Sequence, residues 1–363
     1  MPEGEMYAVI MAGGKGARFW PKSREKMPKH LLDIVSARTI IQETVERIAP
    51  LITEENIVIV TGQSHADELM RQVSRIPREN IIIEPLGRNT APCIGLAALH
   101  IKRRSPHAVM VVLPADHLIT DASRFRRLLS TACEMADSGA HLITIGIKPS
   151  GPETGYGYIE HGSLHAKVKG TDVFEVKSIR EKPPLKQAKA FLKKGGFYWN
   201  SGMFVWRVDI ILEAIKRWLP QVHDGLLQIE CAIGTNGEEK TLRRVYETIP
   251  SISIDYGVME KADNVLLIEG DFGWSDMGSW DALWEVSDKD KNGNAANCRD
   301  LFVGVDASNS LIHSPGKLVA LLGVEDLIVV DTEDSLLICK RGSSQDVKKV
   351  VEILEHKKRK EYL

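Results

Sequence analysis

The segment MAGGKGARFWPKSREKMPKHLL, residues 11–32, directly follows a short apolar run at residues 7–11. The composition of that run is typical of a strand. Gly13, Gly14 and Gly16 then allow the backbone to turn tightly and to approach a ligand. Backbone N–H groups in such a turn can surround phosphate oxygens. The stretch therefore predicts an anion-binding loop immediately after a first strand.

The spacing within this loop excludes two common phosphate-binding motifs. No Gly-Lys-Ser/Thr follows as in a Walker A loop, and Phe19 occupies the last position of G-x-G-x-x-G. What remains is Gly-Gly-x-Gly-x-Arg, followed by Lys29. Arg18 can grip two oxygens, whereas Lys15 and Lys29 act as point charges. Three cations beside a flexible backbone favour a polyphosphate ligand.

Short apolar runs alternate with segments of helical period through the first half of the chain. Runs typical of strands lie at residues 7–11, 57–60, 81–83, 109–113 and 142–147. Between them, apolar residues recur at the 3.6-residue spacing of helices at 40–48, 69–76 and 94–101. The series predicts an α/β fold with a doubly wound, mostly parallel sheet that is covered on both faces. Ligands are expected beyond the carboxyl ends of the strands.

The second half of the chain has a different texture. Extended segments rich in Gly and Tyr (155–160, 174–181 and 199–206), with helical stretches near 210–218 and 242–247, look like insertions that build a second wall of a cleft. A polar boundary lies at 287–299. Short apolar bursts beyond it fit the stacked strands of a small β-helix, and an amphipathic helix from Ser343 closes the chain. We therefore predict domains at 1–286 and 287–363.

Two aspartates stand out as candidate metal ligands. Asp116 lies in LPADH (113–117) at the end of a predicted strand, and Asp276 lies among glycines and tryptophans in FGWSDMGSWDAL (272–283). Mg²⁺ usually takes one or two protein carboxylates and leaves its other positions to water and phosphate. The two side chains can supply that pair. A strand-end cap at Asp116 and a turn-forming aspartate at Asp276 are the alternatives.

Length and composition limit the class of protein. At roughly 100–200 residues per domain, 363 residues suggest about two units. The 47 Lys and Arg residues nearly balance the 49 Asp and Glu residues, so the net charge of −2 gives no general reason to bind nucleic acid or an anionic membrane. Five scattered cysteines without C-x-x-C favour buried thiols over zinc or disulfides. Because the chain has no membrane-length apolar run and no basic signal-peptide start, we predict a cytoplasmic protein.

Seven segments, taken in chain order, resemble the motifs of one family. They are residues 13–29, EPLGRNTAP (84–92), LPADH (113–117), TGYGYIE (154–160), IREKP (179–183), YWNSGMF (198–204) and the segment around Asp276. The set resembles the sugar-phosphate nucleotidyltransferases, and specifically the mannose-1-phosphate guanylyltransferases, over most of the chain. GRNTAP separates this branch from its thymidylyl and uridylyl relatives.

The resemblance implies a role for each matched position. The GTP-binding residues would be Ala12, Gly13, Gly14, Lys15, Gly16, Arg18, Asn89, Thr90, Pro114 and Asp116. Sugar contacts would come from Gly157, Glu181, Lys182 and Asn200, with Lys182 holding the sugar's phosphate. Lys29 would stabilise the transition state at the α-phosphate, and Asp116 and Asp276 would hold Mg²⁺. His30 departs from the glutamine or proline common in the family but leaves Lys29 intact.

The implied reaction is in-line attack by the phosphate of mannose 1-phosphate on the α-phosphorus of GTP, which yields GDP-mannose and pyrophosphate. A phosphate monoester is largely dianionic at pH 7, since its second pKa is about 6. No general base is therefore required, and we expect His117 to be structural. Catalysis then depends on positioning and on positive charge from Arg18, Lys29 and Lys182.

Some alternatives stay open at this point. Residue type alone does not distinguish axial from equatorial hydroxyls or guanine from other bases, so the substrate can be another sugar 1-phosphate or another nucleotide. A non-catalytic regulatory subunit that binds nucleotide sugar would be expected to lack Arg18, the lysines or the aspartates, all of which are present. The family implies a homodimer and a left-handed β-helix. A chain ending at Leu363 has no room for a cupin domain, so isomerase activity is not predicted.

Overall fold

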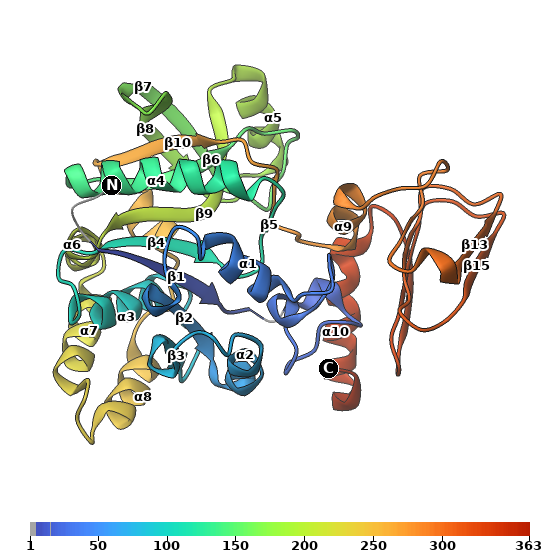
Figure 1. Cartoon of the computed structure of the whole chain (residues 1–363), viewed down its shortest axis with the longest axis horizontal. Helices are drawn as coiled ribbons and strands as arrows, with labels where there is room; N and C mark the ends of the chain where they lie inside the picture. The colour runs from blue at the N-terminus through green and yellow to red at the C-terminus, as the bar shows by residue number, and fades with distance from the viewer. Residues whose placement is uncertain (1–4, 15) are drawn as a thin grey trace.

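The computed structural model describes residues 5–14 and 16–363 of the chain, and a nine-stranded sheet forms its centre (Figure 1). The strand order is β3-β2-β1-β4-β9-β6-β10-β8-β7. Parallel pairs join β1 (Met6–Ala12), β2 (Ile57–Gly62), β3 (Ile81–Glu84) and β4 (Val109–Pro114), and likewise β6 (Leu142–Ile147) and β10 (Val265–Gly270). The five predicted strands are confirmed as β1, β2, β3, β4 and β6.

The Gly- and Tyr-rich segments are strands of the same sheet. β9 (Phe197–Arg207) lies between β4 and β6 and runs antiparallel to both. β7 (Tyr158–Val168) and β8 (Thr171–Arg180) form an antiparallel pair at the sheet's far edge, and β7 also pairs with β9. Helix α5 (Leu185–Lys194) connects β8 to β9 and buries Ala188 against this edge. These segments thus add three strands to the part of the sheet beyond β4: β9 directly beside β4, and β8 and β7 at the edge.

Alternate residues of β1 belong to two different cores, because successive side chains of a strand point to opposite faces. Tyr7 and Val9 pack in a core with helices α3 (Thr90–Lys102), α6 (Val208–Trp218), α7 (Pro220–Ala232) and α8 (Glu238–Thr248). Ala8 and Ile10 pack in a core with α1 (Ile40–Ile48), α2 (Ala66–Gln72) and α4 (Ala122–Ser138). Helices therefore cover both faces, as a doubly wound fold requires.

A smaller unit of short strands follows α9 (Trp280–Val286). Its strands are β12 (Ala295–Ala296), β13 (Phe302–Val305), β14 (Leu311–His313), β15 (Val319–Leu322), β16 (Leu327–Asp331) and β17 (Leu336–Lys340). Two parallel stacks, β12-β14-β16 and β13-β15, fit the expected β-helix. β17 pairs antiparallel with β16 and ends the repeat. The closing helix α10 (Val347–His356) lies between these strands and the large sheet unit (Figure 1).

One hydrophobic core joins the small unit to the segment after the glycine loop. It contains Phe19 and Trp20 together with Trp280, Ile328 and Val347. The Trp280 indole donates to the carbonyl of Trp20 at 3.1 Å, and the Trp20 indole donates to the carbonyl of Tyr362 at 2.8 Å. The two units are therefore packed as one body through the residues that follow the loop.

Two local expectations are wrong. The helix predicted from the apolar spacing at 69–76 ends earlier, at Gln72, the last residue of α2. Val73 and Ile76 are apolar because they are buried in the turn that follows the helix. Cys231 is exposed on α7, whereas Cys93 and Cys133 are buried as expected. Across the described ranges, no helix combines the length and apolar composition that crossing a membrane requires.

The shared core predicts that damage in the small unit destabilises the whole chain. Ile328→Ala removes a side chain with 0% exposure from this core, so we expect the free energy of unfolding to fall by about 2–5 kcal/mol. Urea titration followed by circular dichroism measures the change. Leu322→Ala in the same unit is the control, because Leu322 is 73% exposed and its truncation should change stability by less than about 0.5 kcal/mol. Separate unfolding of the small unit alone would contradict the shared core.

Candidate active site

A short two-stranded ribbon brings the two predicted aspartates together. β5 (Leu118–Ile119) continues from the end of β4 and pairs antiparallel with β11 (Trp274–Ser275). Gly273 makes this pairing possible: it has φ +66°, and a Cβ there would lie 1.7 Å from Oγ1 of Thr120. Asp116, just before β5, and Asp276, just after β11, consequently lie at one end of the ribbon.

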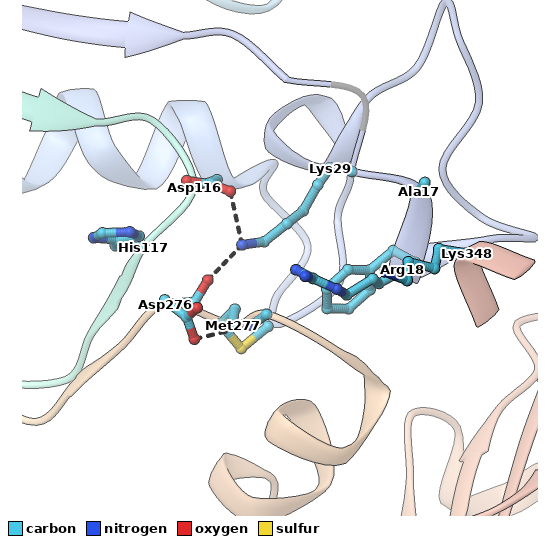
Figure 2. Close-up of a pocket in the computed structure, with 11 residues that line it drawn as sticks. Ala17, Arg18, Lys29, Asp116, His117, Asp276, Met277 and Lys348 are labelled. Carbon is cyan, nitrogen blue, oxygen red and sulfur yellow. Dashed lines mark hydrogen bonds and ion pairs between the residues drawn. The ribbon is translucent and has the colours of Figure 1, made fainter. Parts of the chain in front are cut away.

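Lys29 links the two aspartate segments. Its Nζ donates to Oδ2 of Asp116 at 2.8 Å and to the backbone carbonyl of Asp276 at 2.6 Å (Figure 2). Lys29 is only 5% exposed and begins a 3₁₀ turn that ends at Leu31. Gly16 has φ +60°, and a Cβ at that position would lie 2.7 Å from Cβ of Lys29. Only glycine lets the anion loop pass this close to the lysine.

Asp276 is held by two further donors. Its Oδ1 accepts from the Tyr156 hydroxyl at 2.7 Å and from the backbone N–H of Gly278 at 3.1 Å. Burial and the neighbouring Asp276 carboxylate raise the pKa of Tyr156 above its ordinary range, so its hydroxyl stays a donor. Met277 adopts φ 48°, a left-handed conformation that costs about 1–3 kcal/mol for a residue other than glycine. The surrounding structure therefore fixes the direction of this carboxylate.

The charge state of the site follows from its partners. Burial is the largest single influence on the pKa of Asp116 and raises it, but the charge and hydrogen bond of Lys29, together with the nearby His117 and His30, outweigh burial and lower that pKa to about 2. Burial lowers the pKa of His117 to about 4. Its Nδ1 accepts a hydrogen bond from the Trp274 indole at 3.1 Å, which requires that nitrogen to be unprotonated. At pH 7 the site thus holds an ionised Asp116 and a neutral His117.

Two cavities share the wall formed by Asp116, His117 and Asp276. The first, which we call the loop cavity, has a volume of about 460 Å³ and is lined by the predicted residues Gly16, Arg18 and Lys29. The second, the sheet-edge cavity, has a volume of about 490 Å³. Predicted residues that line the sheet-edge cavity are Gly13, Gly14, Asn89, Thr90, Pro114, Gly157, Glu181 and Asn200. The aspartates therefore stand between a loop-side and a sheet-side space.

Two predicted residues within the described ranges, Ala12 and Lys182, line neither cavity. Ala12 is buried at the end of β1, where its carbonyl accepts from Oγ1 of Thr61. Lys182 has a side chain 60% exposed and a positive φ of 46°, and its Nζ pairs with Glu181 at 3.2 Å. Lys15 lies outside the described residues. Lys182 thus reaches the sheet-edge cavity only through its contact with Glu181.

Comparison with known proteins identifies the family. The nucleotidyl transferase model matches residues 7–293, and the MannoseP isomerase/GMP-like beta-helix domain model matches residues 300–354. The mannose-1-phosphate guanylyltransferase of Escherichia coli K12 is 41% identical over 100% of this chain and 76% of its own length. The chain belongs to the mannose-1-phosphate guanylyltransferase family. The Klebsiella pneumoniae guanylyltransferase is also 41% identical, over 98% of this chain and 75% of its own.

A solved structure supports the family fold over both units. The Thermus thermophilus protein described as a mannose-1-phosphate geranyltransferase aligns with a TM-score of 0.87 and 33% identity. The alignment covers 97% of this chain and 99% of that one. The α/β sheet and the β-helix-like unit therefore occur together in this guanylyltransferase family.

Two residues at this guanylyltransferase-family site, Asp255 and Tyr156, were not predicted from the sequence. Asp255, in a short π-helix at Asp255–Met259, accepts from Nδ2 of Asn200 at 2.6 Å, and burial raises its pKa. Tyr156 reaches Asp276 from the TGYGYIE segment, in which the family resemblance implies a role for Gly157 alone. Asp255 lies outside the seven segments that resemble family motifs. Its role follows from tertiary contacts that sequence periodicity does not report.

The Lys29–Asp116 contact predicts a change in titration. In Lys29→Met the burial of Asp116 is no longer opposed by the ammonium, so the carboxyl pKa should rise from about 2 to above its ordinary value of about 4. Carbon-13 NMR of the carboxyl groups measures this. In the wild type the contact adds stability that is complete above about pH 4 and is lost as the pH falls through 2. Lys22→Met is the control, because Lys22 pairs with Asp33; an unmoved Asp116 titration in Lys29→Met would contradict the assignment.

Proposed function

We propose that the protein transfers GMP from GTP to mannose 1-phosphate and releases pyrophosphate. One observation carries the proposal: the Lys29 ammonium holds two aspartate segments together at the wall between two cavities. The substrates are inferred from the relatives with 41% identity, which are named as mannose-1-phosphate guanylyltransferases. The arrangement suits two bound anions that must meet at a point flanked by cations.

The sheet-edge cavity is the proposed place for guanosine and sugar. Guanine presents N–H donors and needs acceptors. The loop that begins at Glu84 lines the cavity together with Asn89 and Thr90. On the opposite side, Glu181 and Asn200 offer polar groups to sugar hydroxyls. Lys182, beside Glu181, is proposed to hold the sugar's phosphate.

The chemistry follows from charge and position. The dianionic sugar phosphate attacks the α-phosphorus in line, a new phosphorus–oxygen bond forms, and the bond to the β-phosphate oxygen breaks with its electron pair. No proton has to be removed, which agrees with a neutral His117 accepting a hydrogen bond. Lys29 and Arg18 are proposed to offset the repulsion between the two anions.

Asp116 and Asp276 have the chemistry that Mg²⁺ requires. Both line the two cavities, and hydrogen bonds within the described chain use only Oδ2 of Asp116 and Oδ1 of Asp276, which leaves one carboxylate oxygen on each. Clusters of three or more His, Cys, Asp or Glu side chains able to hold a metal are absent from the described ranges. Mg²⁺ needs no such cluster, since it takes one or two carboxylates plus phosphate oxygens. When bound, the ion would neutralise phosphate charge.

Three further properties are proposed from the family resemblance. These are a cytoplasmic location, a homodimer, and the division of the chain at residue 286 into a transferase domain and a β-helix-like domain. Light scattering of the purified protein tests the dimer directly.

The decisive assay measures pyrophosphate release with Mg²⁺, GTP and mannose 1-phosphate. Parallel reactions contain glucose 1-phosphate, the other nucleoside triphosphates or EDTA. Metal-dependent release that prefers GTP with mannose 1-phosphate is expected. Preference for another pair of nucleoside triphosphate and sugar 1-phosphate would show that the substrates differ from those proposed. Binding of GDP-mannose without any turnover would make the protein a regulatory subunit instead.

Asp276→Asn should lower turnover by roughly 10²- to 10³-fold, because the amide keeps the shape but loses the charge proposed to hold the metal. Steady-state kinetics measures the change. Asp271→Asn is the matched control. Asp271 lies between β10 and β11, its side chain is 71% exposed, and it pairs with Arg124 of α4. A near-wild-type rate in Asp276→Asn would remove Asp276 from the reacting centre.

Gly157→Ala should selectively weaken use of the sugar phosphate. A Cβ at Gly157 would lie 2.3 Å from Oε2 of Glu181 and 3.2 Å from Cβ of Asn200, so both proposed sugar contacts must shift. We expect KM for mannose 1-phosphate to rise by about 10-fold while KM for GTP changes less. Gly151→Ala is the control, because a Cβ there meets nothing within 4 Å and Gly151 does not line the sheet-edge cavity. Equal effects in the two variants would refute the assignment of the sugar contacts.

A further inference from the structure

The loop cavity contains a cation from the far end of the chain. Lys348, near the start of α10, lines it together with Arg18 and Lys29, and its side chain lies beside Arg18 (Figure 2). Lys29 is compensated by its contact with Asp116. Arg18 and Lys348 have neither an ion pair nor a hydrogen bond to any other described residue. Two uncompensated positive charges in one cavity repel each other and favour an anion between them.

The backbone that carries Lys348 is fixed on both sides. Val347 is 3% exposed in the core that also holds Phe19 and Trp20, and further apolar residues of α10 pack against the same core: Val350, Val351 and Leu354. The turn before α10 is tied to α9, because Oγ and N of Ser344 both donate to the carboxylate of Asp281. The apolar face of α10 therefore sets the rotation of the helix and places the backbone of Lys348 at the loop cavity.

The position of the cavity identifies the anion. The nucleoside and sugar are proposed to lie in the sheet-edge cavity, on the other side of the Asp116–Asp276 wall. In-line displacement places the leaving group opposite the attacking oxygen. With the sugar phosphate on the sheet side, the β- and γ-phosphates of the nucleotide would extend into the loop cavity and would depart there as pyrophosphate.

We propose that Lys348 binds the leaving pyrophosphate, so that the C-terminal unit supplies part of the phosphate site. This inference rests on the proposed function for the direction of the reaction, whereas the binding of a polyphosphate in the loop cavity rests on the cation cluster alone. Lys348 contributes a point charge that pairs with phosphate oxygens while Arg18 offers its planar fork.

The test compares two neighbouring lysines of α10 in the full-length protein. Lys348→Ala should weaken binding of inorganic pyrophosphate, measured by calorimetry, by about 10-fold, and should raise KM for GTP by a similar factor. KM for mannose 1-phosphate should stay within about twofold, and Lys348→Arg should restore most of the loss. Lys349→Ala is the matched control, because Lys349 pairs with Asp346 on the surface at 3.0 Å and should behave as the wild type.

The outcomes separate this inference from the proposed function. If the wild type turns over GTP and mannose 1-phosphate but Lys348→Ala matches it in pyrophosphate affinity and KM for GTP, only the inference fails. If no substrate pair turns over, yet pyrophosphate binding still falls in Lys348→Ala and not in Lys349→Ala, the proposed function fails and the polyphosphate site stands. Equal losses in the two variants, or no pyrophosphate binding by the wild type, would overturn the inference.

Discussion

The ammonium of Lys29 is the point on which the geometry of the site depends. It is nearly inaccessible to water and donates to the carboxylate of Asp116 and to the backbone of Asp276. A buried charge without a partner is strongly unfavourable, so the strand end that carries Asp116 and the turn that carries Asp276 must both be in place when Lys29 is. The close approach of Gly16 adds the anion loop to the same arrangement. Segments that are distant in the sequence thus become one structural unit around a single positive charge.

The same arrangement divides space in a way that suits the transfer of a nucleotidyl group. The two carboxylates form the wall between the cavities. Arg18 and Lys348, which pair with no other described residue, lie on the loop side, and the polar groups proposed to bind the sugar lie on the sheet side. An in-line displacement has its attacking and leaving oxygens on opposite sides of one phosphorus. With Mg²⁺ proposed at this wall, the loop-side cations on one side and the proposed sugar site on the other, the two negative charges would meet at one point while incoming and outgoing groups stay apart.

The sequence predicted elements better than it predicted neighbours. Hydrophobic period located the strands and helices of the first half. The glycine loop and Asp116 were recognisable because they directly follow predicted strands, and Asp276 because glycines and tryptophans flank it. Periodicity reports burial, however, and not strand order, so the antiparallel insertion of β9 between β4 and β6 was not foreseen. Tyr156 and Asp255 carry hydrogen bonds formed only when distant segments meet. Lys348 follows the ordinary pattern of a solvated helix face, and only packing of that helix on Phe19 and Trp20 places it at the site.

This packing gives the β-helix-like unit a role in the chemistry as well as in stability. A loop with three glycines loses much conformational entropy when it is ordered, since glycine has the most freedom in the unfolded chain. Burial of Phe19 and Trp20, immediately after the loop, offsets part of that cost, and their partners are Trp280 and the strands and helix of the C-terminal unit. The carbonyl of Tyr362 fixes the same segment by accepting from the Trp20 indole and from Arg24. Order in the anion loop is therefore coupled to folding of the chain's last residues, and the small unit acts as a wall of the site.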